Sequence, residues 1–460
     1  MVDAEWSPQT RAVYVQGAID EWNAWINYWD RKTKYGKMMA NPYAFYRGTA
    51  QLFWRDFAED PRLETFGHAG TATWLVGDAH AYNFGAFTND RGELLYDLND
   101  FDESIVADYQ FDLWRLAVSV VLIARANDNL SDSKTGEVLD AMSGKYLAAM
   151  HSLMDQKDKD AEKESFTQDD TYGRLDEFLG AIEKDNSREK MLNKWVPEGA
   201  GGARVFDLSN PKLGSVTRQE RQALLDAMDD YWGTIHIDAD TPSTELEPSS
   251  TTVRDVARRL LAGTGSLGTT RYYLLLEDGD GELHILDIKQ QSKPAAYPFL
   301  SDARKTDYDG HADGNDARAH AVAYRALSSH PDPFLGWMKL SDGWFSVRQR
   351  SPYKEAFPAL LTDATGDFKS LKLDSKSRYT KLAEQWGTIL AVDHAYAERV
   401  EAKERGAGET LKAQISAATS GREADFAALV RTIAFEYADQ VKVDWASFVD
   451  GLGADIVPLD

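Results

Sequence analysis

The alternation of apolar and polar residues along the first 250 positions predicts helices interrupted by short strands. Short apolar runs at residues 74–76 and 93–98, with turn-forming residues at 89–92 between them, predict two buried strands joined by a turn. The largely apolar segment 111–125 predicts a buried helix, and the segment 135–154 predicts another. This part of the chain is therefore expected to be mostly helical.

Three tryptophans mark the N-terminal region. Trp22, Trp25 and Trp29 have helical spacing, which is more typical of core positions than of a ligand cage. An almost entirely charged run at residues 155–164 predicts a solvated loop or helix end, and the glycine-rich run at 199–202 predicts a flexible connection.

The pattern changes near residue 250, where strand-like segments replace helical ones. A glycine-rich loop at 263–268 and a turn at 278–281 separate these segments, which predicts an antiparallel meander. A helix at 316–328 and a second hairpin complete a compact α+β unit. The strands are expected at residues 253–261, 271–276, 283–289 and 344–349.

After Pro352 the chain is predicted to be helical to near its end. One face of this region repeats apolar residues at i, i+4, i+7 and i+8, which is typical of a helix that packs on a core. These residues are Leu382, Trp386, Ile389 and Leu390.

Composition identifies the broad class of protein. Of 460 residues, 43% are hydrophobic and 27% charged, a globular balance, and 51 Lys+Arg against 75 Asp+Glu give a net charge of −24. Such an acidic chain is not expected to bind nucleic acid or an anionic membrane. The absence of cysteine excludes disulfides, thiolate zinc sites and cysteine nucleophiles. With no signal peptide or membrane-length apolar stretch, a cytoplasmic protein is expected.

Two acidic clusters follow the first two predicted strands. The first is the run from Gly77 to Asn83, which contains Asp78, and the second places four carboxylates in seven residues. Asp and Asn also favour turns, which is the simpler explanation for either cluster alone. Together they favour an oxygen-rich site for magnesium with bound phosphate. The four carboxylates are those of Asp97, Asp100, Asp102 and Glu103.

A third cluster combines the glycine loop at 263–268 with Lys289. Because a strand and not a helix follows the loop, dinucleotide binding of the Rossmann type is disfavoured. Glycines between antiparallel strands let backbone N–H groups approach phosphate oxygens, and a lysine on the next strand can reach the same phosphates. The alternative is a flexible hairpin with a surface lysine.

These residues resemble two families. The run from Gly77 to Asn83 is similar to the catalytic loop of aminoglycoside and choline kinase-like phosphotransferases, and residues 100–102 resemble their metal-binding loop. The chain also resembles a large bacterial family, domain of unknown function 2252. Its matching segments are residues 37–39, 42–48, 77–85, 99–103, 263–268, 289 and 347–349.

The kinase-like resemblance implies an α+β, protein-kinase-like two-lobed fold. Because the glycine loop and lysine follow the catalytic loop instead of preceding it, the fold is expected to be circularly permuted. The expected parts are a large helical lobe with the catalytic and metal-binding loops, a small antiparallel-sheet lobe that binds the nucleotide, and a helical segment that packs back on the large lobe. They cover residues 1–245, 246–350 and 351–460.

The resemblance implies a phosphotransferase that uses ATP and magnesium to modify an unidentified small-molecule or protein hydroxyl. Asp78 would orient the acceptor hydroxyl and take its proton, while Asn83 and Asp100 would hold magnesium. Asp102 or Asp97 would be ligands of a second metal. Backbone groups at Gly263, Gly265, Ser266 and Gly268 would cover the phosphates.

Lys289 would pair with the α and β phosphates, with Asp316 as a weak candidate for its carboxylate partner. His80 is expected to order the catalytic loop by hydrogen bonding. Arg47 would act either as a phosphate or substrate clamp or as the partner of a buried Asp. Asp112, which opens a helix, is expected to anchor the loop. His394 is expected to be structural.

Three alternatives use the same residues. The site could transfer an adenylyl group, or the early Asp/His/Asn cluster alone could form a metal-dependent phosphohydrolase. The chain could also bind nucleotide without catalysis.

Overall fold

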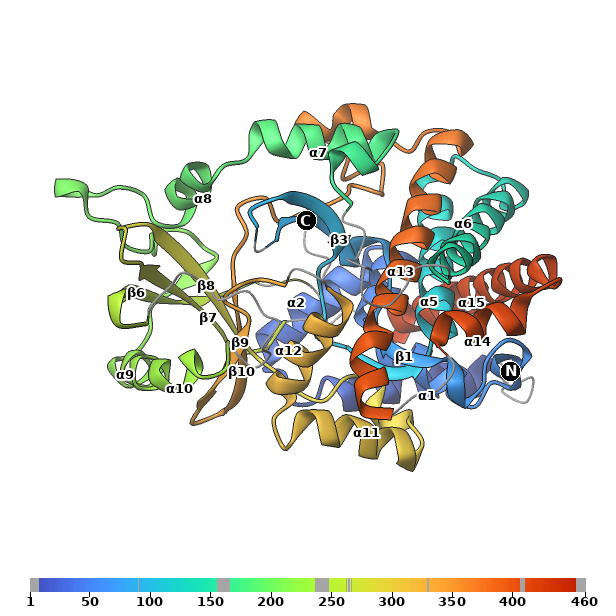
Figure 1. Ribbon diagram of the computed structural model, residues 1–460, viewed down its shortest axis with the longest axis horizontal. Coiled ribbons are helices and arrows are strands. Elements are labelled where there is room, and N and C mark those ends of the chain that lie inside the picture. Colours follow the sequence, from blue (N-terminus) through green and yellow to red (C-terminus); the bar gives the residue numbers. More distant parts are fainter. Residues whose placement is uncertain are drawn as a thin grey trace.

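The computed structural model describes residues 8–89, 91–154, 166–235, 248–261, 263, 265, 267–328, 331–405 and 410–451. It shows a mixed α+β protein with antiparallel sheets. A six-stranded sheet lies at one end of the molecule and a body of long helices at the other (Figure 1). The predicted loop at 155–164 and Ser266 lie outside the described residues. No helix in the described ranges has the length and apolar character needed to cross a bilayer.

The six-stranded sheet is antiparallel throughout, in the order β5-β6-β7-β8-β10-β9. The predicted meander is confirmed, and so is the hairpin that adds β9 and β10. The strands are β5 (Leu213–Gly214), β6 (Thr252–Arg259), β7 (Arg271–Glu277), β8 (Leu283–Gln290), β9 (Gly336–Leu340) and β10 (Gly343–Gln349).

Helices cover both faces of this sheet. Along β7, Tyr272 and Leu274 face a cluster that includes Tyr231, whereas Tyr273 faces a second cluster that includes Trp195. This alternation is the period of two expected for a strand buried on both sides. The covering helices α8 (Arg188–Trp195), α9 (Arg218–Asp226) and α10 (Met228–Trp232) precede residue 246 in the chain. The three-part division of the chain stays a prediction.

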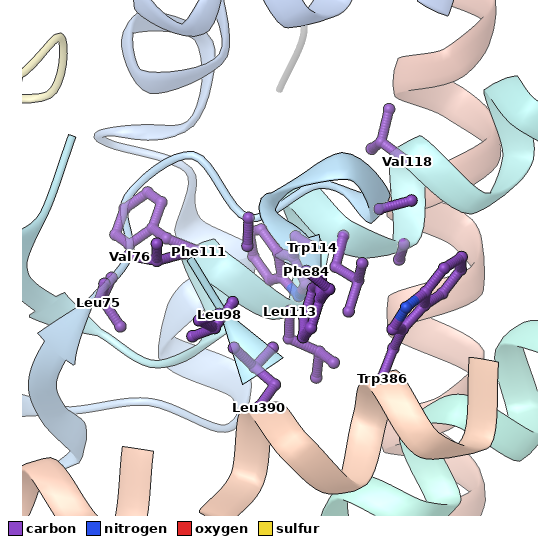
Figure 2. Packing of buried hydrophobic residues seen from close by; sticks show 14 of the residues in the cluster. Leu75, Val76, Phe84, Leu98, Phe111, Leu113, Trp114, Val118, Trp386 and Leu390 are labelled. Atoms are coloured by element: carbon purple, nitrogen blue, oxygen red, sulfur yellow. The ribbon is translucent and has the colours of Figure 1, made fainter. Parts of the chain in front are cut away.

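The helical body is built around α5 (Gln110–Asn127), in which residues 110–124 are all buried. A helix that is apolar on every side requires neighbours all round. Figure 2 shows side chains of this helix packed against Phe84, Leu98, Trp386 and Leu390. The predicted apolar stripe that contains Trp386 and Leu390 is therefore a core face, as expected. The surrounding helices are α6 (Asp132–Leu153), α13 (Lys376–Arg405), α14 (Leu411–Thr419) and α15 (Glu423–Gly451).

Two small sheets lie within the helical body. In one, β1 pairs with β4, and in the other the order is β11-β2-β3. The sequence predicted β1 and β3 but not β2. The turn at 89–92 was therefore wrongly predicted to join β1 to β3, whereas it joins β2 to β3. The strands are β1 (Ala72–Leu75), β2 (Phe84–Thr88), β3 (Leu94–Leu98), β4 (Ile105–Asp108) and β11 (Glu355–Ala356).

The prediction that three tryptophans are core residues of one helix was wrong for Trp25 and Trp29, whereas Trp22 packs against the core. The side chain of Asn23 donates to the carbonyl of Ile19 at 2.7 Å, just past the end of α1 (Pro8–Trp22). A new helix, α2 (Tyr28–Met39), then begins at the N-cap Asn27. Trp25 and Trp29 lie in or next to this break, and their exposed fractions are 60% and 72%.

Helix α12 (Asp316–Leu327) links the sheet to the helical body. It packs on β9 and β10 on one side and on β1 and α13 on the other. Its Tyr324 ring stacks on Phe101, with centroids 4.3 Å apart, in the loop after β3. The remaining helices are α3 (Pro42–Gly48), α4 (Ala50–Phe57), α7 (Arg174–Asp185) and α11 (Asp302–Ala312).

Close packing of α13 on α6 gives the first testable prediction. A Cβ at Gly387 would lie 2.3 Å from the carbonyl oxygen of Met142, so Gly387→Ala must push the helices apart. Overpacking of this kind costs about 1–3 kcal/mol. At Gly144 on α6 a Cβ would meet nothing within 4 Å, so Gly144→Ala should stabilise the helix by up to about 1 kcal/mol.

Free energies of unfolding from urea denaturation would measure both effects. The two substitutions are the same chemical change in packed helices, so changes of the same sign would contradict this account of the interface.

Candidate functional site

A cavity of about 620 Å³ gathers most of the predicted site residues. Its walls come from the N-terminal helices, the loops after β1 and β3, the glycine loop and the end of β8. The volume lies in the range that binds small molecules. The predicted residues that line it are Asp78, Asn83, Asp100, Asp102, Gly263, Gly265 and Lys289.

The loop after β1 is fixed by a backbone position that only glycine can fill. Gly77 has φ +76°, and a Cβ there would lie 1.8 Å from the carbonyl oxygen of Glu103. The carboxylate of Asp112 accepts hydrogen bonds from the backbone N–H groups of Val76 (2.8 Å) and Gly77 (3.0 Å). The indole of Trp54 donates to the Gly77 carbonyl at 2.9 Å. The two acidic loops therefore touch directly.

Asp112 is the loop anchor that the sequence predicted, but it does not cap its own helix. It reaches back across the core to the end of β1, and His394 supports it from α13, with Nε2 3.4 Å from Oδ2 of Asp112. The hydroxyl of Tyr146 lies 2.9 Å from Nδ1 of the same ring. All three side chains are buried. The structural role expected for His394 is confirmed.

Asp78 lies at the inner end of this loop and forms an ion pair with the buried Arg115 of α5. Burial raises the pKa of Asp78 above its usual range, although the charge of Arg115 opposes the shift. The amide nitrogen of Asn83 donates to the Asp78 carbonyl at 2.7 Å. His80 orders the loop less directly than predicted, because its Nε2 is 3.6 Å from the Asp78 carboxylate and its Nδ1 has no hydrogen-bond partner in the described part of the chain.

Asp100 is the carboxylate in the cavity best suited to a cation. Its Oδ1 is buried and has no hydrogen-bond partner among the described residues. Burial and then the charge of Asp102 raise the pKa of Asp100 to about 6. Asn83 is held close by, because Asn99 N donates to the Asn83 carbonyl at 2.9 Å. An orphaned carboxylate oxygen and a side-chain amide that line the same cavity fit magnesium that also binds phosphate.

Lys289 extends from β8 across the cavity and forms an ion pair with Asp102. Gln291 donates to the other oxygen of Asp102 at 2.9 Å, and His320 of α12 lies 3.6 Å from it. Burial opposes ionisation, but Lys289 and His320 outweigh it and hold the pKa of Asp102 well below its usual range. Asp316, the candidate partner from the sequence, instead accepts from the hydroxyl of Tyr308 at 3.0 Å.

Two predicted residues do not line the cavity. Asp97 is buried within β3, where its carboxylate accepts from the N–H of Leu98 at 2.8 Å. Gly268 has φ +88°, and a Cβ there would lie 2.7 Å from Ile26, so this glycine is needed for packing against the segment between α1 and α2. By contrast, Gly263 and Gly265 have open space around them.

Sequence reasoning missed the significance of two cavity residues. Burial raises the pKa of Glu103 to about 7, although Ala295 N–H donates a hydrogen bond to its carboxylate. Burial lowers the pKa of Lys34 to about 8, with Glu103 opposing the shift. Glu103 belongs to the acidic string, which was a usable signal, whereas nothing in the local pattern of α2 marks Lys34. Trp22 and Trp25, which were predicted as core residues, contribute aromatic side chains to the lining of the cavity.

No three His, Asp or Glu side chains in the described ranges are grouped as a metal centre. Magnesium commonly takes one or two protein carboxylates and completes its shell with water and substrate phosphate, so Asp100 and Asn83 fit that pattern.

Comparison with known proteins places the chain in one family. No curated protein and no solved structure matches it. A family model described as an uncharacterized protein conserved in bacteria (DUF2252) matches residues 31–451, which is most of the chain. The protein therefore belongs to the DUF2252 family.

Proposed function

We propose that this protein is a phosphotransferase that uses ATP and magnesium to phosphorylate a hydroxyl group, with kinase-like parts in circularly permuted order. The observation that carries the proposal is the ion pair between Lys289 and Asp102, formed across 187 residues of chain next to the orphaned Asp100 carboxylate. A lysine–acid ion pair beside an acid that can hold a metal ion is the arrangement that protein kinases use for phosphoryl transfer from ATP.

The acidic and basic groups of the cavity would have separate roles. Bound magnesium and ATP would supply the phosphoryl group and neutralise its charge. Asp100 and the amide oxygen of Asn83 would hold the metal. Lys289, oriented by Asp102, would bind phosphate oxygens, and the open backbone at Gly263 and Gly265 would approach them from the sheet side.

Asp78 would orient the acceptor hydroxyl and accept its proton as the new oxygen–phosphorus bond forms and the bond to ADP breaks. Its ion pair with Arg115 keeps it in place, and its raised pKa makes it a better base than an exposed aspartate. Glu103 lines the same cavity with a pKa of about 7, so it is the second candidate for the base.

The proposed permutation needs only the assembled geometry. Catalysis depends on where groups lie in space and not on their order along the chain. The sheet that carries the glycine loop and Lys289 follows the acidic loops in sequence, yet the cavity has walls from both.

Nucleotide binding is the first test. ATP with magnesium should raise the melting temperature, because a ligand at roughly a hundredfold its Kd stabilises the folded state by about 2.7 kcal/mol. The shift should vanish in Asp100→Asn and persist in Asp280→Asn, an exposed acid in the β7–β8 turn. An absent shift in the wild type at millimolar nucleotide contradicts the proposal.

Substitution of Lys289 separates this function from metal-dependent phosphate-ester hydrolysis. Lys289→Met should weaken ATP binding about tenfold to a hundredfold, the worth of one charged hydrogen bond. Lys339→Met, on the exposed side of β9 in the same sheet, should not. Isothermal titration would measure both. Hydrolysis of a generic phosphate ester without ATP, unaffected by Lys289→Met, would indicate the hydrolase instead.

The raised pKa of Asp100 predicts a pH-dependent stability cost. Between its ordinary value of 3.8 and about 6, the folded protein holds a proton on Asp100 that the unfolded chain releases. The cost of ionising this group is thus fully present above about pH 7 and is lost only below about pH 3. Asp100→Asn should therefore stabilise the free protein at pH 8 by on the order of 1–3 kcal/mol, and by only about 0.5 kcal/mol at pH 4.

Denaturation curves across this range would test the prediction, with Asp280→Asn as the control. A difference between Asp100→Asn and wild type that does not change with pH would show that Asp100 is not held in a costly ionised state.

A further inference from the structure

Three of the five cations that line the cavity have no acidic partner within the described residues, whereas Lys289 pairs with Asp102 and Lys293 with Asp309 at 2.7 Å. Of the three, Arg55 is exposed, and its guanidinium lies 4.2 Å from the centroid of the Tyr14 ring. The other two are less exposed. Lys34 is only 4% exposed, and its ammonium group makes no hydrogen bond or ion pair among the described residues. The guanidinium of Arg47 likewise pairs with no carboxylate, and its Nε is buried without an acceptor.

The fold holds these two cations on neighbouring helices. Lys34 lies on α2 and Arg47 on α3, and the helices pack closely because Gly48 leaves room for the side chain of Met38, which would lie 2.6 Å from a Cβ at position 48. Asn41 caps α3 by accepting from the N–H of its third residue at 2.8 Å.

Arg47 is oriented by aromatic rings toward the catalytic loop. Its guanidinium lies 4.9 Å from the centroid of the Tyr82 ring and 6.0 Å from that of Tyr43. Burial, followed by the charge of Arg47, lowers the pKa of His80, so the guanidinium lies close to the loop that carries Asp78. Asp78 does not neutralise it, because that carboxylate pairs with Arg115.

Buried charges without counter-charges cost several kcal/mol each, and a protein retains them where a ligand supplies the opposite charge. Glu103 is the acid whose charge acts on the pKa of Lys34, but it lies too far away to form an ion pair. Its carboxylate accepts a hydrogen bond from the Ala295 N–H instead. An anion bound in the cavity would offer each of these two cations a counter-charge.

We propose that Lys34 and Arg47 bind an anionic group, a phosphate or a carboxylate, that the hydroxyl acceptor carries itself. This inference rests on the proposed phosphotransferase function and names its substrate class. The nucleotide phosphates would lie against Lys289 and the glycine loop on the sheet side, whereas Lys34 and Arg47 come from the N-terminal helices beside Asp78. The acceptor is thus an alcohol with its own negative charge.

Titration of inorganic phosphate into the full-length protein tests this second anion site. Phosphate should bind wild type with similar affinity in the presence and absence of a saturating non-hydrolysable ATP analogue with magnesium. Lys34→Met and Arg47→Met should each weaken phosphate binding about tenfold or more. Lys32→Met, on α2 but outside the cavity lining, should leave it unchanged. Lys289→Met should weaken the nucleotide and spare phosphate.

The comparison of phosphate binding with and without the ATP analogue uses only wild-type protein. It therefore tests the second anion site even where a variant fails to fold. Displacement of phosphate by the nucleotide analogue would overturn the inference, because Lys34 and Arg47 would then hold nucleotide phosphates. Absence of binding by both phosphate and acetate would also overturn it. Whichever of phosphate and acetate binds with higher affinity identifies the charged group of the acceptor. Phosphate binding without nucleotide binding would support the anion site and refute the phosphotransferase function.

Discussion

The ion pair between Lys289 and Asp102 is the interaction that joins the two halves of the site. Lys289 belongs to a strand of the six-stranded sheet, and Asp102 belongs to a loop of the helical body. Because both groups are largely buried, loss of either partner would leave an uncompensated charge, which is far more costly than loss of a surface pair. The sheet is thereby held in the position from which its glycine loop reaches the cavity.

Four carboxylates of the two acidic loops line this cavity, and each is stabilised differently. Arg115 neutralises Asp78, Lys289 neutralises Asp102, and a backbone N–H group bonds to Glu103. Asp100 alone among these four has a fully buried oxygen without a hydrogen-bond partner in the described chain. On the N-terminal helices, Lys34 and Arg47 line the same cavity without an acidic partner among the described residues. This pattern of unsatisfied charge suits the proposed ligands, a nucleotide with its metal ion and an acceptor that carries an anionic group.

Local structure was predictable from the sequence where one physical signal dominated. The apolar run of α5, the turn residues of the β7–β8 hairpin and the stripe on α13 each gave the correct element. Strand β2 begins directly after the Gly77–Asn83 run, and no strand was predicted there. Trp25 and Trp29 were misplaced because one polar side chain, Asn23, ends α1 within an apparently continuous pattern. The partner of Lys289 was missed because it lies 187 residues away, and spacing carries no information about such pairs.

The two sides of the site differ in how firmly the fold holds them, and this difference suits the proposed chemistry. The Asp78 loop is fixed by Gly77, which no other residue can replace. It is also fixed by the buried side-chain contacts that link Gly77 through Asp112 to His394. Groups that must meet a reacting hydroxyl gain most from such preorganisation. Across the cavity, a Cβ added at Gly263 or Gly265 would meet nothing within 4 Å among the described residues, so a ligand can approach the backbone closely there. A rigid acid side facing an open phosphate side is the arrangement expected where the acceptor must be aligned accurately and the nucleotide must enter and leave.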